Sequence, residues 1–288
     1  MATTTPFHRV AIIGTGLIGG SFALALRRQF PEISIVGLSH SGSAGRALER
    51  HAVDEIAADL ASAVRGADLV YVALPIVASI EALGAIAKAA ESHALVTDAG
   101  STKAAICHAA REHFRGDALF LGGHPMAGKE RSGIDQAEAT LFNAAPYVLM
   151  GTEATADPRA KRFAEVVRLV GARPVWCDPD THDWAVGIVS HLPQLVAVAL
   201  ARVVQDETDE TGLPLSLAGQ GLQDTLRLAG SPYSVWRDIL LTNTDNVSRA
   251  LDRLAQAVDY LRTHLASRDI EQEFAGANEL YKLLRKPS

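Results

Sequence analysis

Apolar residues follow two different patterns along this chain, and the change of pattern divides it into two parts. In the first part, short apolar runs alternate with stretches in which apolar residues recur every three or four positions. The runs predict strands and the stretches predict helices. Some runs, such as 67–75, are apolar almost throughout, as in strands buried on both faces of a parallel sheet. We therefore predict a doubly wound α/β domain.

The pattern also gives the order of the elements. Strands are expected near 10–13, 33–38, 53–56, 67–75, 94–98, 119–123, 147–151 and 173–176, and helices near 45–51, 60–64, 76–90, 104–113 and 158–170. Later residues predict only helices, near 183–206, 215–228, 234–241, 245–267 and 270–285. The boundary falls in the stretch 177–181, where Asp180 or Thr181 is expected to cap the first long helix.

Closely spaced glycines follow the first apolar run and precede an Ala/Leu-rich helix. Gly14 permits a sharp turn, Gly16 lets a pyrophosphate approach the backbone, and Gly19 lets the helix pack closely on the strand. The anion would lie on free N–H groups at the positive end of the helix. A turn that only packs helix on strand would leave Gly16 unexplained. We therefore predict a dinucleotide-binding domain over residues 1–178. The later helices carry long apolar stripes that must be buried, which predicts a helical substrate and dimerisation domain over 179–288.

The loop after the second strand is expected to determine whether the protein binds NAD or NADP. An acid in this loop favours NAD because it binds the ribose 2′-hydroxyl and repels a 2′-phosphate. This loop has no acid, and it offers Ser39, His40, Ser41, Ser43 and the nearby Arg46. We predict NADP, with use of both cofactors as the alternative. The predicted cofactor-binding residues are Gly14, Gly16, Leu17, Ile18, Gly19, Ser39, His40, Ser41, Leu74, Pro75 and Ser101.

Composition narrows the classes of partner. The chain has 48% hydrophobic residues, a formal charge of -6 and no basic run, which favours a small-molecule partner over nucleic acid or an anionic membrane. We find no signal-peptide pattern and expect no apolar stretch of membrane-spanning length, so a cytoplasmic location is predicted. Cys107 and Cys177 form neither a disulfide framework nor a zinc motif, and we predict no metal.

Two polar residues follow strands at the edge where such sheets place their ligands. Ser101 lies after the fifth strand and is expected to face the nicotinamide, although a cap for the next helix is the alternative. His124 is expected in a loop after the sixth strand. A dehydrogenase needs a group that takes or polarises a hydroxyl proton, and histidine titrates near neutral pH. His124 is therefore the candidate catalytic residue, against a histidine that is merely hydrogen-bonded.

Four separated motifs give the chain a family resemblance over nearly all of its length. They are Gly14-Thr15-Gly16-Leu17-Ile18-Gly19-Gly20-Ser21, Asp98-Ala99-Gly100-Ser101-Thr102-Lys103, Gly123-His124-Pro125-Met126-Ala127-Gly128 with Glu130 and Ser132-Gly133, and Ser190-His191-Leu192-Pro193 with Leu222-Gln223-Asp224-Thr225-Leu226-Arg227. With them the chain resembles the prephenate/arogenate dehydrogenases of tyrosine biosynthesis. The resemblance implies a Rossmann-type domain, an all-helical second domain and a homodimer formed through the helices.

The same resemblance implies an activity and roles for residues. The activity is oxidation of a ring hydroxyl with loss of a carboxylate, giving 4-hydroxyphenylpyruvate from prephenate or tyrosine from arogenate. His124 would accept the hydroxyl proton, and Ser101 would orient it. Arg227 would hold a substrate carboxylate as a two-pronged donor. Glu130 matches a residue that forms an ionic gate, and His191 belongs to a motif on the substrate side.

Two departures from the family pattern lie on the substrate side. Gln194 stands where many relatives carry a second histidine, which is associated with the substrate side chain. Lys129 stands where a small hydroxyl residue is common, and adds a cation. These changes leave open whether prephenate or arogenate is the preferred substrate. Since the chain stops soon after the helical part, we expect no fused mutase or regulatory domain.

Two other readings stay open on the residues alone. One is another two-domain reductase, such as a relative of the β-hydroxyacid dehydrogenases, which usually rely on a lysine in the helical domain. The lysines beyond the boundary are Lys282 and Lys286, at the extreme end. The other is a Rossmann-type redox sensor, which would bind the cofactor without turnover.

Overall fold

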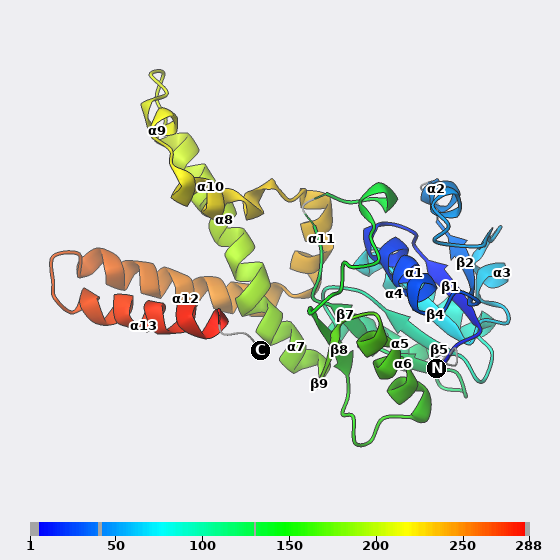
Figure 1. The fold of residues 1–288 in the computed structure, drawn as a ribbon. Helices are drawn as coiled ribbons and strands as arrows, with labels where there is room; N and C mark the ends of the chain where they lie inside the picture. Colours follow the sequence, from blue (N-terminus) through cyan, green and yellow to red (C-terminus); the bar gives the residue numbers. More distant parts are fainter. Residues whose placement is uncertain (1–5, 40–41, 130, 286–288) are drawn as a thin grey trace.

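The first part of the chain is built on a six-stranded parallel sheet. The computed structural model describes residues 6–39, 42–129 and 131–285, and Figure 1 shows its fold. The strand order is β3-β2-β1-β4-β5-β6. The strands are β1 (Arg9–Ile13), β2 (Ser34–Leu38), β3 (Glu55–Ile56), β4 (Leu69–Val72), β5 (Leu95–Asp98) and β6 (Leu119–Leu121). This is the order of a doubly wound dinucleotide-binding sheet, so the predicted fold class is confirmed.

Both faces of this sheet are buried under helices. The helices are α1 (Leu17–Gln29), α2 (Ser43–Glu49), α3 (Leu60–Val64), α4 (Ile76–Ala89), α5 (Ala104–His113) and α6 (Pro158–Leu169). Along β1, Val10 and Ile12 enter one hydrophobic cluster, while Ala11 and Ile13 enter another. Successive side chains of a strand point to opposite faces, so a strand covered on both sides is apolar throughout.

A second, three-stranded sheet places His124 on a strand. β7 (Gly123–Pro125) runs antiparallel to β8 (Pro146–Met150), which runs parallel to β9 (Arg173–Cys177). The expected strand at 119–123 therefore ends early, and the prediction of His124 in a loop was wrong. Gly122 lies at the crossing, where an added Cβ would be 2.6 Å from Met150 Cγ. Only glycine permits this close passage from one sheet to the next.

The helical part begins with one continuous helical run. α7 (Pro179–Val186) passes through a π-helical segment (Gly187–His191) into α8 (Leu192–Asp206). Its N-cap is Asp178, which accepts a hydrogen bond of 2.9 Å from the Thr181 backbone N–H. The prediction of Asp180 or Thr181 as the cap was therefore wrong, because the acid before Pro179 reaches the free N–H of the first turn.

The run over Pro179–Asp206 is long and apolar enough to cross a membrane by length and composition alone. The expectation of no such stretch was therefore wrong. In the sequence, polar residues and Pro193 interrupt this apolar stretch. In the structure, the π-helical segment joins α7 to α8, so the interrupted stretch forms one helix.

The remaining helices follow α8, and all but α11 extend away from the sheet. They are α9 (Leu213–Ser216), α10 (Gln220–Leu226), α11 (Tyr233–Thr242), α12 (Thr244–Thr263) and α13 (Ile270–Leu284), with a 3-10 turn at Leu228–Gly230. The single helix expected near 215–228 is divided, and Gly219 begins its second piece, α10. In Figure 1, α12 and α13 form an antiparallel pair that projects from the molecule, while α11 lies beside the sheet.

Candidate active site

The glycine turn between β1 and α1 leaves room for a ligand at one position. Gly14 has φ +98° and an added Cβ would be 2.4 Å from Ala73 O, while a Cβ on Gly19 would be 2.0 Å from Gly14 O. Both glycines are therefore required by the protein itself. Gly16 has an ordinary φ of -77°, and its Cβ would meet no protein atom within 4 Å. This open position lies at the N-terminus of α1, where free backbone N–H groups can bind a phosphate group.

Other predicted cofactor residues surround the same turn. Leu17, Ile18 and Leu74 are half-buried, and Pro75 is exposed at the start of α4. Ser39 follows β2, and the Ser43 hydroxyl donates to it over 2.8 Å. The Ser43 and Thr15 hydroxyls are also 2.8 Å apart, which joins the end of β2 to the glycine turn. The predicted residues His40 and Ser41 lie outside the described ranges.

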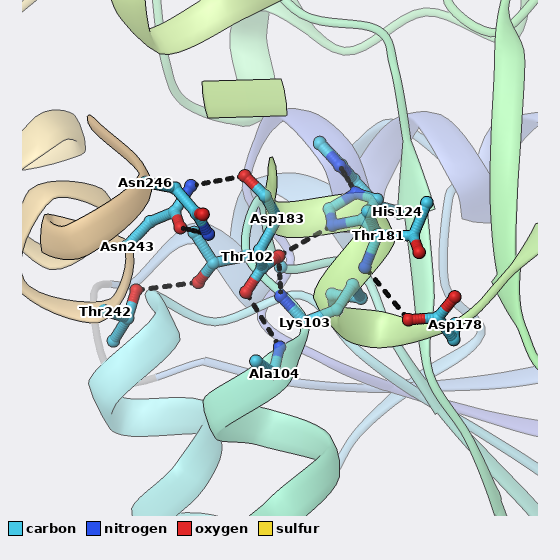
Figure 2. Close-up of polar contacts among 12 residues, drawn as sticks. Thr102, Lys103, Ala104, His124, Asp178, Thr181, Asp183, Thr242, Asn243 and Asn246 are labelled. Atoms are coloured by element: carbon cyan, nitrogen blue, oxygen red, sulfur yellow. Dashed lines mark hydrogen bonds and ion pairs between the residues drawn. The ribbon is translucent and has the colours of Figure 1, made fainter. Parts of the chain in front are cut away.

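The N-terminus of α5 is capped from the helical part of the chain. The backbone N–H groups of Lys103 and Ala104 donate to the two carboxylate oxygens of Asp183, over 2.7 and 2.9 Å. Figure 2 shows this fork, with Asp183 pointing at the first turn of α5. Ser101 is therefore not the cap of α5, and it stays half-buried in the loop between β5 and the helix.

His124 forms the outer end of a buried hydrogen-bond relay. Its Nδ1 is 2.8 Å from Nε2 of His182, and the Nδ1 of His182 is 2.7 Å from Asp183 Oδ1. His182 and Asp183 are almost fully buried, and His124 is 8% exposed. A carboxylate only accepts hydrogen bonds, so His182 donates from Nδ1, and with a neutral ring it accepts at Nε2. His124 then donates from Nδ1, which leaves its Nε2 as an acceptor.

The surroundings of His124 keep it neutral. Burial lowers its pKa well below the usual histidine value, and the neighbouring His182, Lys103 and His191 lower it further. A neutral imidazole with a free acceptor nitrogen is the form that a general base needs. The relay and the burial therefore favour the same state of His124.

A buried ion pair positions the backbone beside His124. Lys103 Nζ pairs with Asp98 Oδ2 and donates to Gly123 O over 2.8 Å. The Gly123 N–H donates to Asp98 Oδ1 over 3.2 Å. Both side chains are fully buried. Since both polar groups of Gly123 are held, the start of β7 has a fixed position at the end of β5.

A second group of polar residues surrounds Asp183 on the helical side. Asn243 Nδ2 is 2.8 Å from the Asp183 carbonyl and 3.2 Å from His191 Nδ1. Burial lowers the pKa of His191 to about 4, with Asp183 opposing this effect and His182 adding to it. Gln194 is also buried, at the start of α8. His191 is therefore linked to Asp183 through Asn243, which is within hydrogen-bond distance of its Nδ1.

The other predicted substrate residues lie elsewhere. The ammonium of Lys129 is 3.1 Å from Glu138 Oε1, so its charge is balanced within its own segment. Arg227 is exposed at the end of α10, which lies along the outer half of α8, away from β7 (Figure 1). Glu130 lies outside the described residues. Among the described residues, no cluster of three His, Cys, Asp or Glu is arranged for a metal.

Sequence reasoning missed His182, Asp183 and Lys103 as contributors to the site. Lys103 stood inside a recognised motif, five positions after Asp98, and this spacing was a usable signal. His182 and Asp183 lie at the start of a long helix, where polar residues usually act as local caps. His182 and His124 are 58 positions apart, so no local sequence pattern connects them.

A cavity of about 710 Å³ lies apart from all of these residues. Its lining includes His8, His93, Arg159 and Arg162. These residues lie at the amino ends of the strands, whereas ligands of doubly wound sheets bind at the carboxyl ends. His124 instead follows β6 at the carboxyl ends of the strands, where it contacts His182 of the helical part.

Comparison with known proteins agrees with this geometry. The family model "Prephenate dehydrogenase, nucleotide-binding domain" matches residues 22–176, and "Prephenate dehydrogenase, dimerization domain" matches residues 178–285. A prephenate dehydrogenase of Bacillus subtilis is 32% identical over 92% of this chain and 72% of its own length.

Two solved structures extend the comparison. The prephenate dehydrogenase of A. aeolicus, in complex with hydroxyphenyl propionate and NAD+, has a TM-score of 0.85 and 29% identity, covering 96% of this chain and 97% of its own. The arogenate dehydrogenase of Synechocystis has a TM-score of 0.79 and 32% identity, covering 95% of this chain and 99% of its own.

Proposed function

Because this chain belongs to the prephenate dehydrogenase family, we propose that it uses His124 to oxidise and decarboxylate prephenate, arogenate or both. Its relatives carry the names of these two activities. The relay from His124 through His182 to Asp183 carries the proposal, because it leaves Nε2 of His124 as a neutral acceptor. The substrate hydroxyl needs such a partner.

Each group in the site has a task in this reaction. Bound NAD(P) would accept the hydride from the ring carbon that bears the hydroxyl. His124 Nε2 accepts a hydrogen bond from the hydroxyl and then its proton, which returns to the oxygen in the phenol product. The ring carboxylate leaves as carbon dioxide, and its bonding electrons complete the aromatic ring. Ser101 would orient the hydroxyl toward His124.

The chain is an NAD(P)-dependent oxidoreductase, and we propose a preference for NADP. The two described positions that flank the gap after β2, Ser39 and Gly42, carry no acid, and the sequence shows none between them. Ser39 is half-buried there and accepts a hydrogen bond from the Ser43 hydroxyl, and the exposed Arg46 follows on α2. A ribose 2′-phosphate would therefore meet donors, while a 2′-hydroxyl would lack the usual carboxylate partner.

We propose that substrate binding is completed in a homodimer of the helical parts, with the domain boundary between residues 178 and 179. Arg227 directly follows α10, a helix that Figure 1 shows apart from β7 of the same chain. To hold a carboxylate near His124, it would therefore come from a second copy. Gln194, Glu130, Lys129 and His191 stay proposed substrate-side residues, and a cytoplasmic location stays a prediction.

The test is the rate of reduced-cofactor formation with prephenate and arogenate, each with NAD and NADP. The variant His124→Asn should lower kcat by about 10²- to 10⁴-fold, the range for loss of general base catalysis. Its cofactor affinity should be unchanged. The matched control is His113→Asn, an exposed histidine on α5. Full turnover in His124→Asn would contradict the role of His124, and cofactor binding without turnover in any pairing would contradict the proposed activity.

A further inference from the structure

Helix α2, which follows β2, is hydrogen-bonded to the segment that follows β7. α2 begins after β2, where the adenosine ribose of a dinucleotide lies in this fold. A 3-10 turn, η1 (Ile134–Gln136), follows the loop after β7. Arg46 Nη1 on α2 is 2.5 Å from Asp135 Oδ2 in η1, across 89 positions of sequence. The two segments therefore meet at the edge that the ribose would occupy.

Arg46 in α2 and Arg50, the C-cap of α2, bind the η1 segment in different ways. Arg50 donates to the backbone carbonyls of Ile134 and Ala137, which are fixed parts of the chain. Among the residues that the structure describes, Arg46 binds the carboxylate of Asp135 alone, and the two side chains are 51% and 57% exposed. An incoming anion can therefore take the place of the Asp135 carboxylate at Arg46, while Arg50 keeps α2 attached.

The η1 segment has its own anchors and does not depend on the Arg46 ion pair. Ile134 and Ala137 are buried in the core cluster that includes α1. A Cβ on Gly20 would be 2.3 Å from Ile134 Cδ1, so helix and segment are in close contact. The Glu138 N–H also donates to the Ser21 hydroxyl over 3.0 Å. Loss of the Asp135 charge should therefore leave the segment in place.

We propose that Arg46 binds the 2′-phosphate of NADP and that Asp135 is a competing anion that limits the preference for NADP over NAD. This inference rests on the proposed dinucleotide-binding function. A phosphate offers a guanidinium two charge-assisted hydrogen bonds, so it can displace a half-exposed carboxylate. The neutral 2′-hydroxyl of NAD cannot displace it, and Arg46 then stays on Asp135. Asp135 thus weakens NADP binding and leaves NAD binding unaffected.

The experiment measures binding of two fragments to the full-length protein by calorimetry. Adenosine 2′,5′-bisphosphate carries the 2′-phosphate, and adenosine 5′-monophosphate lacks it. Asp135→Asn should tighten the bisphosphate about two- to fivefold, the range for release of an exposed ion pair, with no change for the monophosphate. Arg46→Gln should weaken the bisphosphate about tenfold or more. The ratio of the KM for NADP to the KM for NAD should fall in Asp135→Asn and rise in Arg46→Gln.

The matched control is Glu138→Gln, which removes one negative charge from the same segment, where the acid pairs with Lys129. It should leave both fragments unchanged. A bisphosphate effect in Glu138→Gln equal to that in Asp135→Asn would overturn the inference, because general charge would explain both. Weaker monophosphate binding in Asp135→Asn would also overturn it, since Asp135 would then hold the ribose. If the unmodified protein bound neither fragment nor either cofactor, the proposed function itself would fail.

Discussion

At the residue scale, the proposed chemistry of His124 depends on the buried side chains of His182 and Asp183. A neutral imidazole has one acceptor nitrogen, and which nitrogen it is depends on the hydrogen bond at the other. Asp183 orients His182, and His182 orients His124. Asp183 also holds two backbone N–H groups of α5, so its carboxylate cannot turn away from the relay.

The relay makes His182→Asn a test of positioning. We expect kcat to fall about tenfold or more, because His124 loses the partner that fixes its tautomer, while cofactor affinity stays the same. His182 also lowers the pKa of His124. Its removal should raise that pKa, so activity should be lost at a higher pH as the solution is acidified. An unchanged pH profile with an unchanged kcat would contradict the relay.

The sequence supplied the catalytic candidate but not its support. His124 and Ser101 were recognisable because they follow strands at the edge where ligands bind, and their roles stay predictions. His182 and Asp183 were hidden, because hydrogen bonds between distant positions leave no periodic trace in a sequence. Lys103 was in view, but only the structure shows that its ammonium holds Gly123.

At the element scale, two carboxylates of the helical part hold the helices that leave the sheet. Asp183 caps α5, and Asp238 on α11 accepts a hydrogen bond of 3.2 Å from the Val77 N–H in the first turn of α4. Acids are favoured at helix N-termini by the free N–H groups and the helix dipole. The strands, helices and their order followed from local periodicity, whereas these caps depend on which elements meet.

In the glycine turn, Gly16 is expected to serve ligand binding, whereas Gly19 is required for folding. Gly16→Val should weaken NADP binding about tenfold or more and leave the thermal midpoint unchanged, because its Cβ meets no protein atom. Gly19→Ala should destabilise the protein by about 1–3 kcal/mol, because its Cβ would overlap Gly14 O. Thermal unfolding and cofactor titration of the two variants check this contrast. Equal destabilisation of both would show that Gly16 serves packing alone.

At the scale of the whole molecule, the helical part presents apolar side chains that one chain cannot cover. α13 has no buried residue, and Phe274, Leu280 and Leu284 are exposed along it. Val203 on α8 and Val258 on α12 are exposed as well. Exposed apolar side chains in such number are typical of an interface. The family model for residues 178–285 is named for dimerization, and the exposed faces fit that role.

The apolar face of α13 therefore gives the last prediction. Phe274→Glu places a charge on this face, so it should convert the dimer to a monomer in sedimentation measurements, because a buried unpaired charge is costly. Gln272→Glu adds the same charge two positions away, on a different side of the helix, and should stay dimeric. Turnover should fall with the dimer while cofactor binding persists, since Arg227 of the partner subunit would be lost from the site. A fully active Phe274→Glu monomer would show that each chain completes its own site.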